Sequence, residues 1–342
     1  MNLIIRRFGG SIAFTVFALA GAFAVGYAPG KNLSAGFSAL FAATILGVLE
    51  TSLSFDNAVV NARILEGMNA FWRRMFLTVG IVIAVFGMRI VFPLVIVWAV
   101  GNLSLPDVAS LTWRDPGEFQ RILVAQHVKV AGFGGAFLWM VFFRFFMDAG
   151  KELHWLGAIE RVLCRIGRME TLWIASTMAV AFVFRSFVPQ DEAANFLSSA
   201  MAGVLAYLLV EGMGDLLGKG STGVKTAAAG LSSFLYLEVL DASFSFDGVI
   251  GAFAITNNLL IIALGLGIGA MFVRSLTIVM VDTGALARFA YLEHGAFWAI
   301  GALALVLFLA ASGVEVPEVV SGSIGLVLIL ASLFSSRFRK KP

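Results

Sequence analysis

Charged residues and cysteine are scarce in this sequence of 342 residues. Only 13% of the residues are charged, whereas a soluble globular domain typically has about 25%. Hydrophobic residues make up 60% of the chain, which excludes an ordinary soluble domain. Cys164 is the only cysteine, so an intrachain disulfide is excluded. The net charge of +3 is small and fits basic residues at helix ends, so no nucleic-acid partner is expected.

Long apolar runs recur from one end of the sequence to the other. A membrane-spanning helix needs about 20 predominantly apolar residues. In lipid a backbone must satisfy its own hydrogen bonds, which a helix does. The sequence therefore predicts an all-α, polytopic membrane protein in contact with the lipid bilayer. The ten predicted transmembrane helices cover residues 10–28, 36–62, 75–100, 128–148, 171–188, 195–217, 227–255, 258–284, 295–312 and 317–336.

The basic residues predict how these helices cross the membrane. Lys and Arg collect in the loops on the cytoplasmic side. A cytoplasmic N-terminus puts most of the 24 basic residues on that side, and the C-terminus is then cytoplasmic as well. Residues 151–170 are expected to form an amphipathic helix on the inner membrane surface, with Leu156, Ile159, Leu163 and Ile166 on its apolar face.

One short motif occurs twice in the chain, as Leu49–Asp56 and as Leu240–Asp247. The leucine, both serines, a phenylalanine and the final aspartate are identical in the two copies. The second and the seventh predicted helix carry the copies and run in opposite directions. Two inverted five-helix repeats are therefore predicted, residues 1–190 and residues 191–342, an architecture that recurs in transporters.

The acidic residues of the two copies are costly at bilayer depth, by roughly 2.5–3.5 kcal/mol each. Neither copy contains Cys or His, and a set of oxygen donors suits hard or borderline cations such as Mg²⁺, Ca²⁺ and Mn²⁺. The predicted metal ligands are Glu50, Asp56, Asn57, Glu238, Asp241 and Asp247. The predicted auxiliary residues are Ser52, Ser54, Ser243, Ser245, Arg89, Arg274 and Asp282.

Spacing within the motifs predicts two further details. Ser52 and Ser243 each lie four residues before an aspartate of the motif, so each serine is expected to orient that aspartate. Gly248 follows Asp247 directly, and a break in the helix is expected there, which would free carbonyl oxygens for an ion.

Other interpretations of these residues remain open. Arg89 and Arg274 could form structural ion pairs with the acids, although two arginines cannot neutralise them all. Asp282 could belong to an ion or proton path, or could reach to the interface from the end of a helix. Glycines 265, 267 and 269 imitate a dinucleotide fingerprint, but inside a membrane helix they indicate close helix packing. No nucleophile–base arrangement is present, so no enzyme is expected.

Three stretches, Leu49–Val60, Phe86–Pro93 and Leu237–Gly248, resemble the signature of the TerC-like integral membrane family. The resemblance continues through Gly265–Asp282 and Tyr291–Gly295, and points to a bacterial branch of unknown function within that family. It implies membership of the LysE-like transporter superfamily, in which TerC relatives export manganese, and calcium as a second candidate, across the bacterial inner membrane.

Carried over by position, the resemblance implies that the ion-binding residues are Glu50, Asp56, Asn57, Asp241 and Asp247. At Phe297 this sequence departs from the pattern of the TerC-like family, which often has a histidine at this position.

These observations predict a transporter that exports a divalent cation, with manganese as the first candidate, through carboxylates at the membrane midplane. Proton exchange is the expected energy source because no nucleotide-binding motif is present, and no permanently bound cofactor is expected. The alternative is a non-transporting scaffold or metal sensor in a metal or tellurite stress response, with cytoplasmic stress-response partners.

Overall fold

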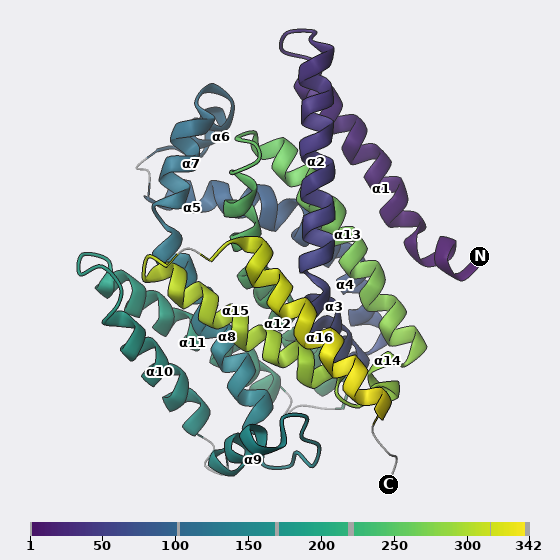
Figure 1. The fold of residues 1–342 in the computed structure, drawn as a ribbon, viewed down its shortest axis with the longest axis vertical. Coiled ribbons are helices and arrows are strands. Elements are labelled where there is room, and N and C mark those ends of the chain that lie inside the picture. The colour runs from purple at the N-terminus through teal and green to yellow at the C-terminus, as the bar shows by residue number, and fades with distance from the viewer. Residues whose placement is uncertain (1, 101–102, 168–170, 218–221, 315, 339–342) are drawn as a thin grey trace. The chain divides into compact units, whose positions relative to one another are not determined.

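Every regular element that the computed structural model describes is a helix (Figure 1). The described residues are 2–100, 103–167, 171–217, 222–314 and 316–338. The helices are α1 (Asn2–Tyr27), α2 (Leu33–Leu53), α3 (Phe55–Gly67), α4 (Ala70–Val82), η1 (Ile83–Val91, a π-helix), α5 (Phe92–Val100), α6 (Leu105–Arg114), α7 (Pro116–Val124), α8 (His127–Phe146), α9 (Gly157–Ile166), α10 (Leu172–Arg185), α11 (Ala193–Leu217), α12 (Thr222–Ala252), α13 (Leu259–Thr283), α14 (Ala285–Arg288), α15 (Leu292–Ala311) and α16 (Glu318–Phe338).

Eight helices in the described residues are long and apolar enough to cross a membrane, so the polytopic all-α fold is confirmed. They are Arg7–Tyr27, Leu33–Leu53, Ala70–Val100, His127–Phe146, Ala193–Met213, Leu259–Thr283, Leu292–Ala311 and Val319–Phe338. Two other predicted spans correspond to α10 and α12. The α10 helix is apolar but has only 14 residues. The α12 helix has 31 residues but carries three acids, of which Asp241 and Asp247 belong to the second motif and Glu238 precedes it.

The chain forms two compact units, each assembled from three separate segments. Unit 1 comprises Met1–Ser54, Arg74–His127 and Phe244–Val279, and unit 2 comprises Phe55–Arg73, Val128–Ser243 and Met280–Pro342. The boundaries pass through both copies of the motif, after Ser54 in the first and after Ser243 in the second. Each unit therefore takes residues from both halves of the sequence, and the inverted repeat stays a prediction.

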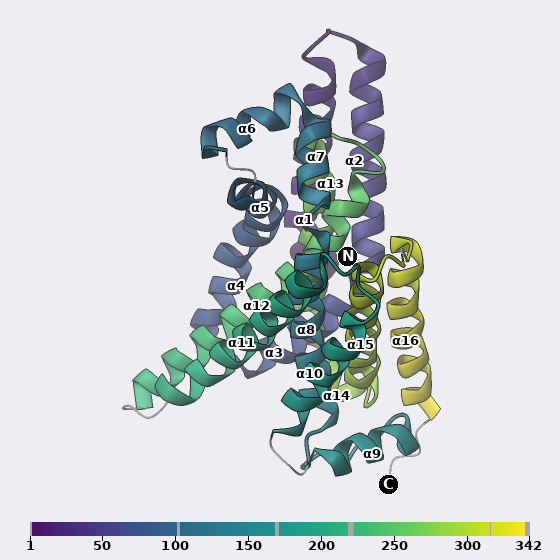
Figure 2. The same cartoon turned by 90° about the vertical axis from the view of Figure 1, so that its left-hand side faces the viewer.

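Unit 1 contains a closely packed antiparallel pair, α1 and α2 (Figure 2). Asn32 caps the start of α2, because its side chain accepts a hydrogen bond from the Ser34 backbone N–H at 2.9 Å. Small residues permit the close approach, since a Cβ added at Gly26 would lie 2.6 Å from the Ala35 carbonyl oxygen. Ile261 of α13 packs into the same alanine-rich core.

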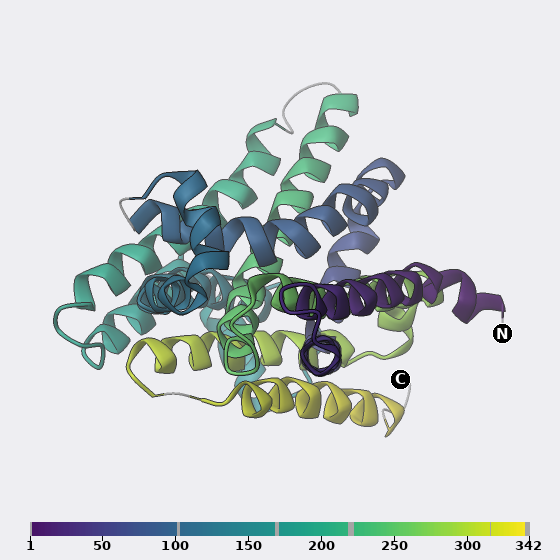
Figure 3. The same cartoon turned by 90° about the horizontal axis from the view of Figure 1, so that it is seen from above.

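Unit 2 contains a second closely packed pair, α15 and α16, which Figure 3 shows side by side. The α3 helix packs against α15, and α10 packs against α11. Aromatic rings fill much of the space between α8 and α15, where Trp298 lies 4.9 Å from Phe146 and 5.2 Å from Phe142, measured between ring centroids. The α3 helix, which carries the end of the first motif, itself packs against α15 and α16.

Candidate cation site

The first copy of the motif breaks its helix, whereas the second does not. The α2 helix ends at Leu53, and the backbone N–H of Ser54 donates to the Glu50 carbonyl at 3.0 Å before α3 begins at Phe55. Such a helix end leaves several carbonyl oxygens without a helical partner. Asp56 lies in the first turn of α3, where the helix dipole favours a negative charge.

The break predicted at Gly248 is wrong. The α12 helix continues through Asp247 and Gly248 to Ala252. A glycine inside a helix costs only about 1 kcal/mol relative to alanine, and Gly248 is buried within unit 1, so packing can offset this cost. The side chain of Asp247 lies outside the described part of the structure, so its role as a metal ligand stays a prediction.

In unit 1 Glu50 forms a buried ion pair with Arg89. The Nη2 atom of Arg89 lies 2.6 Å from Oε1 of Glu50, and Arg89 also donates to the Ala84 carbonyl. Arg89 is 4% exposed and Glu50 is 8% exposed, so water does little to screen the attraction between their charges. Arg89 belongs to the π-helix η1, and π-helical turns often occur at functional sites. The ion pair considered for Arg89 is therefore present.

Arg274, the other predicted auxiliary arginine, binds backbone carbonyl groups. Its two terminal nitrogens donate to Phe76 at 2.7 Å and to Gly80 at 2.9 Å. Its guanidinium lies 3.7 Å from the centroid of the Phe76 ring, within cation–π range. These contacts attach α13 to α4 within unit 1.

The glycines of α13 explain how Glu50 is accommodated in unit 1. A Cβ added at Gly265 would lie 2.7 Å from Cβ of Leu46, and one added at Gly269 would clash with the side chain of Glu50. The prediction that these glycines serve close helix packing is confirmed.

In unit 2 residues of both motif regions meet, through α3 and α12. Nδ2 of Asn61 on α3 donates to Oδ1 of Asp241 on α12 at 3.2 Å. Asp56 and Asn57 on α3 and Glu238 on α12 are buried as well. The Oδ1 atoms of Asn57 and Asn61 are buried and accept no hydrogen bond within the described structure. A buried amide oxygen of this kind is an acceptor to which a cation could bind.

The α16 helix approaches Asp56 at a glycine. A Cβ added at Gly325 on α16 would lie 3.5 Å from Oδ2 of Asp56. Glycine at this position therefore leaves room beside the carboxylate, since α16 presents backbone rather than a side chain there. Among the described residues, no three of His, Cys, Asp and Glu lie together in a way that could hold a metal ion.

The auxiliary serines behave differently from the prediction. The hydroxyl protons of Ser52 and Ser243 go to the carbonyl groups of Val48, at 2.7 Å, and Val239, at 2.9 Å. The prediction that Ser52 orients Asp56 is wrong, because its hydroxyl proton bonds to a carbonyl of its own helix. The side chain of Asp247 lies outside the described residues, so the role predicted for Ser243 stays a prediction. Ser54 caps the C-terminal end of α2, and Ser245 is buried in unit 1 with no hydrogen bond to its Oγ within the described structure. Asp282 is exposed near the end of α13.

Sequence reasoning missed two polar residues. Asn61 follows Asn57 by four residues and therefore lies on the same face of α3, a spacing that could have identified it. The second is Glu160, which is fully buried in unit 2 and accepts hydrogen bonds from the Trp155 and Leu156 backbone N–H groups and from Trp298 Nε1. Its position in a predicted surface helix gave no indication of burial.

The amphipathic helix predicted at 151–170 is α9, which is shorter than expected. Residues 168–170 lie outside the described ranges. Ile159 and Ile166 are 54% and 42% exposed, so these two apolar residues face away from unit 2 while Glu160 faces inward. Placement of α9 on a membrane surface stays a prediction.

Lys151, just before α9, is held over aromatic rings. Its Nζ lies 3.2 Å from the centroid of Phe145, and the Phe145 ring stacks on Phe297 with centroids 3.7 Å apart. Burial lowers the pKa of Lys151 from 10.5 to about 8, with Glu160 opposing the shift. Phe297 thus serves as an aromatic packing residue.

Comparison with known proteins assigns the chain to a family. Residues 55–342 match the family described as "Protein of unknown function (DUF475)". The chain belongs to the DUF475 family. The DUF475 match begins at the first residue of α3 and includes Asp56, Asn61 and the whole second motif, whereas Glu50 precedes it. No curated protein and no solved structure matches the chain.

Proposed function

We propose that this DUF475 protein is a membrane transporter that exports a divalent cation, with manganese as the first candidate and calcium as the second. It would be a TerC-like member of the LysE-like superfamily, as the repeated motif suggests. Glu50, Asp56, Asn57, Glu238, Asp241 and Asp247 would supply the ligands during transport.

The observation that carries the proposal is the contact between Asn61 and Asp241. It joins the helix that ends the first motif to the helix of the second, in a region with buried carboxylates. Buried carboxylates are expensive and usually serve a function in membrane proteins. The donors on these two helices are oxygens, which favours a hard or borderline cation over a soft one.

Carboxylates also provide a means of coupling. A carboxylate must lose its proton to bind a metal ion, so cation binding and proton release are linked. We propose proton exchange as the energy source. The two inverted halves, residues 1–190 and 191–342, would provide the alternating access that such exchange requires.

The same proposal includes the cellular location. The protein would lie in a bacterial inner membrane with both termini in the cytoplasm, because that topology puts most basic residues on the cytoplasmic side.

The experiment is a measurement of intracellular manganese in a bacterium that lacks its own exporters. Cells would express the wild type, the double variant Asp56→Asn, Asp241→Asn, or the control Asp191→Asn, which changes an exposed loop carboxylate. The proposal predicts that the wild type and the control lower manganese and restore growth in excess metal, whereas the double variant does neither.

Unchanged manganese in wild-type cells, with the protein present in the membrane, would contradict manganese export. The same assay with calcium then tests the second cation. Binding of metal without flux, together with capture of cytoplasmic stress-response proteins, would favour the scaffold or sensor instead.

A further inference from the structure

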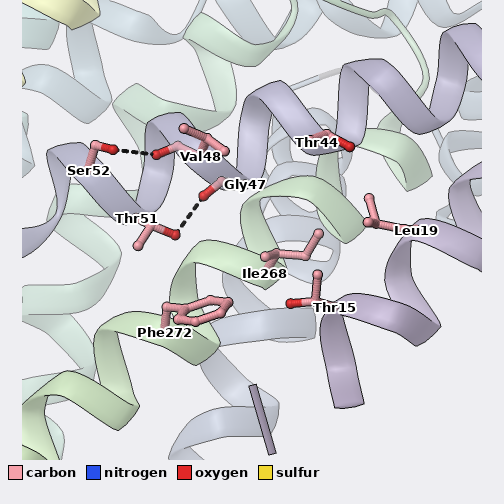
Figure 4. A pocket seen from close by; sticks show the side chains of 9 residues that line it. All are labelled: Thr15, Leu19, Thr44, Gly47, Val48, Thr51, Ser52, Ile268 and Phe272. Carbon is pink, nitrogen blue, oxygen red and sulfur yellow. Dashed lines mark hydrogen bonds between the residues drawn. The ribbon is translucent and has the colours of Figure 1, made fainter. Parts of the chain in front are cut away.

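A cavity of about 300 Å³ lies in unit 1 among α1, α2 and α13 (Figure 4). Thr15 lines it from α1, Thr44 and Thr51 line it from α2, and Ile268 and Phe272 line it from α13. No charged side chain contributes to the lining. Its walls belong to three of the helices that are long and apolar enough to cross a membrane.

The hydroxyl groups in this lining are already used as donors. Thr15, Thr44, Thr51 and Ser52 each donate to the carbonyl four residues earlier in the same helix, at distances from 2.6 to 2.8 Å. Figure 4 shows two of these bonds, from Thr51 and from Ser52. The donor protons are therefore unavailable to a ligand, and the cavity offers mainly methyl, methylene and aromatic surface.

The position of the cavity indicates what fills it. Its walls are parts of membrane-crossing helices, and Val48 at its edge is 61% exposed on the surface of α2. Hydrocarbon tails are the solvent at that depth, and an empty apolar space forfeits dispersion contacts that a flexible chain can restore. We propose that the cavity binds the acyl chain of a membrane phospholipid.

A bound chain would lie next to the first motif. Thr51 and Ser52 directly follow Glu50, whose carboxylate is paired with Arg89 rather than exposed in the cavity. The acyl chain would thus contact the last turn of α2 at Thr51 and Ser52, while Glu50 of the same turn is paired with Arg89. This proposal concerns lipid and does not depend on cation export.

The test is photolabelling of the full-length protein in vesicles that contain a phospholipid with a diazirine in its acyl chain, followed by mass spectrometry of peptides. The reference is the lipid-exposed surface of α2 around Phe37 and Phe41, which are 60% and 64% exposed. We expect at least five-fold more label on Thr44–Ser52 and Ile268–Phe272 than on this reference.

Two valine variants make the test specific. Val48→Phe adds a ring at the edge of the cavity and should lower labelling of the lining at least five-fold. Val79→Phe adds the same ring to α4 at a valine that is 41% exposed and does not line the cavity, and should leave labelling unchanged.

Thr44→Val checks the claim about the hydroxyls without adding volume, and should retain the label. Equal labelling of lining and reference, or no effect of Val48→Phe, would overturn the proposal.

Discussion

The carboxylate of Glu50 lies 2.6 Å from the guanidinium of Arg89, and both residues are buried in unit 1. The arginine is presented by a π-helix, and the glutamate lies in the last turn of a helix that breaks at Ser54. An acid predicted to bind a cation thus already has an internal cation beside it. Any metal ion that uses Glu50 must compete with Arg89 or displace it.

Removal of Arg89 should destabilise the protein strongly. Arg89→Met leaves Glu50 buried without its partner, and breaking a buried pair in this way costs about 3–5 kcal/mol. The double variant Glu50→Leu, Arg89→Met should recover most of this loss, because it removes both charges. Equilibrium unfolding in mixed micelles measures both effects, and a double variant no more stable than Arg89→Met would contradict the ion pair as the cause.

Gly269 should tolerate no larger residue. Its added Cβ would clash with Glu50, so Gly269→Ala must displace α13 or the glutamate and should cost about 1–3 kcal/mol. The matched control is Gly10→Ala in α1, where an added Cβ meets nothing within 4 Å. The control should be neutral or slightly stabilising in the same unfolding measurement, since alanine favours a helix. Equal stability of the two variants would rule out the close contact.

Asn61 should affect cation affinity, even though it lies outside the repeated motif. Asn61→Ala removes the hydrogen bond from Asn61 to Asp241. Loss of a residue that hydrogen-bonds to a metal ligand typically weakens metal binding by about 10–100-fold. The expected result is a higher KM for manganese in proteoliposomes with little change in protein stability. The control is Asn195→Ala in α11, which removes a similar hydrogen bond, from Asn195 to the carboxylate of Glu192 just before that helix. An unchanged KM for Asn61→Ala would separate Asn61 from the site.

Lys151 should make stability depend on pH in the alkaline range. Its pKa is about 8 in the folded protein and 10.5 ordinarily, so between these values the unfolded chain binds more protons than the folded one. The free energy of unfolding should therefore rise from about pH 8 to about pH 10.5. Above this range the lysine is uncharged in both the folded and the unfolded state, so folding no longer releases a proton from the amine over Phe145. Thermal unfolding across this range should give a smaller rise for Lys151→Met, and identical slopes would contradict the assignment.

The long apolar runs predicted the fold class correctly, because a bilayer requires continuous helices of a fixed minimum length. Close packing at Gly265 and Gly269 was also predictable, because small residues let membrane helices approach closely. Local sequence was a poor guide to the helix break, however. Gly248 stays helical because packing overrides its weak preference, whereas the break occurs at Ser54, which has no strong breaking tendency of its own.

Burial of polar residues depends on tertiary contacts that spacing alone does not reveal. Glu160 lies in a short helix with exposed isoleucines, yet it turns inward to the indole of Trp298, 138 positions along the chain. Asn61 meets Asp241 across 180 positions, a contact that only the folded arrangement of α3 and α12 provides. The acids of the motif were identifiable because charge in an apolar run is conspicuous.

The most direct test of cation export is manganese flux in proteoliposomes that contain only the purified protein. A fluorescent indicator inside the vesicles would report manganese entry driven by a proton gradient, for the wild type, Asp56→Asn, Asp241→Asn and the control Asp191→Asn. The account predicts flux for the wild type and the control, and none above empty vesicles for the two motif variants. Equal flux from Asp56→Asn, Asp241→Asn and the wild type would contradict the assignment of these carboxylates to the transport site.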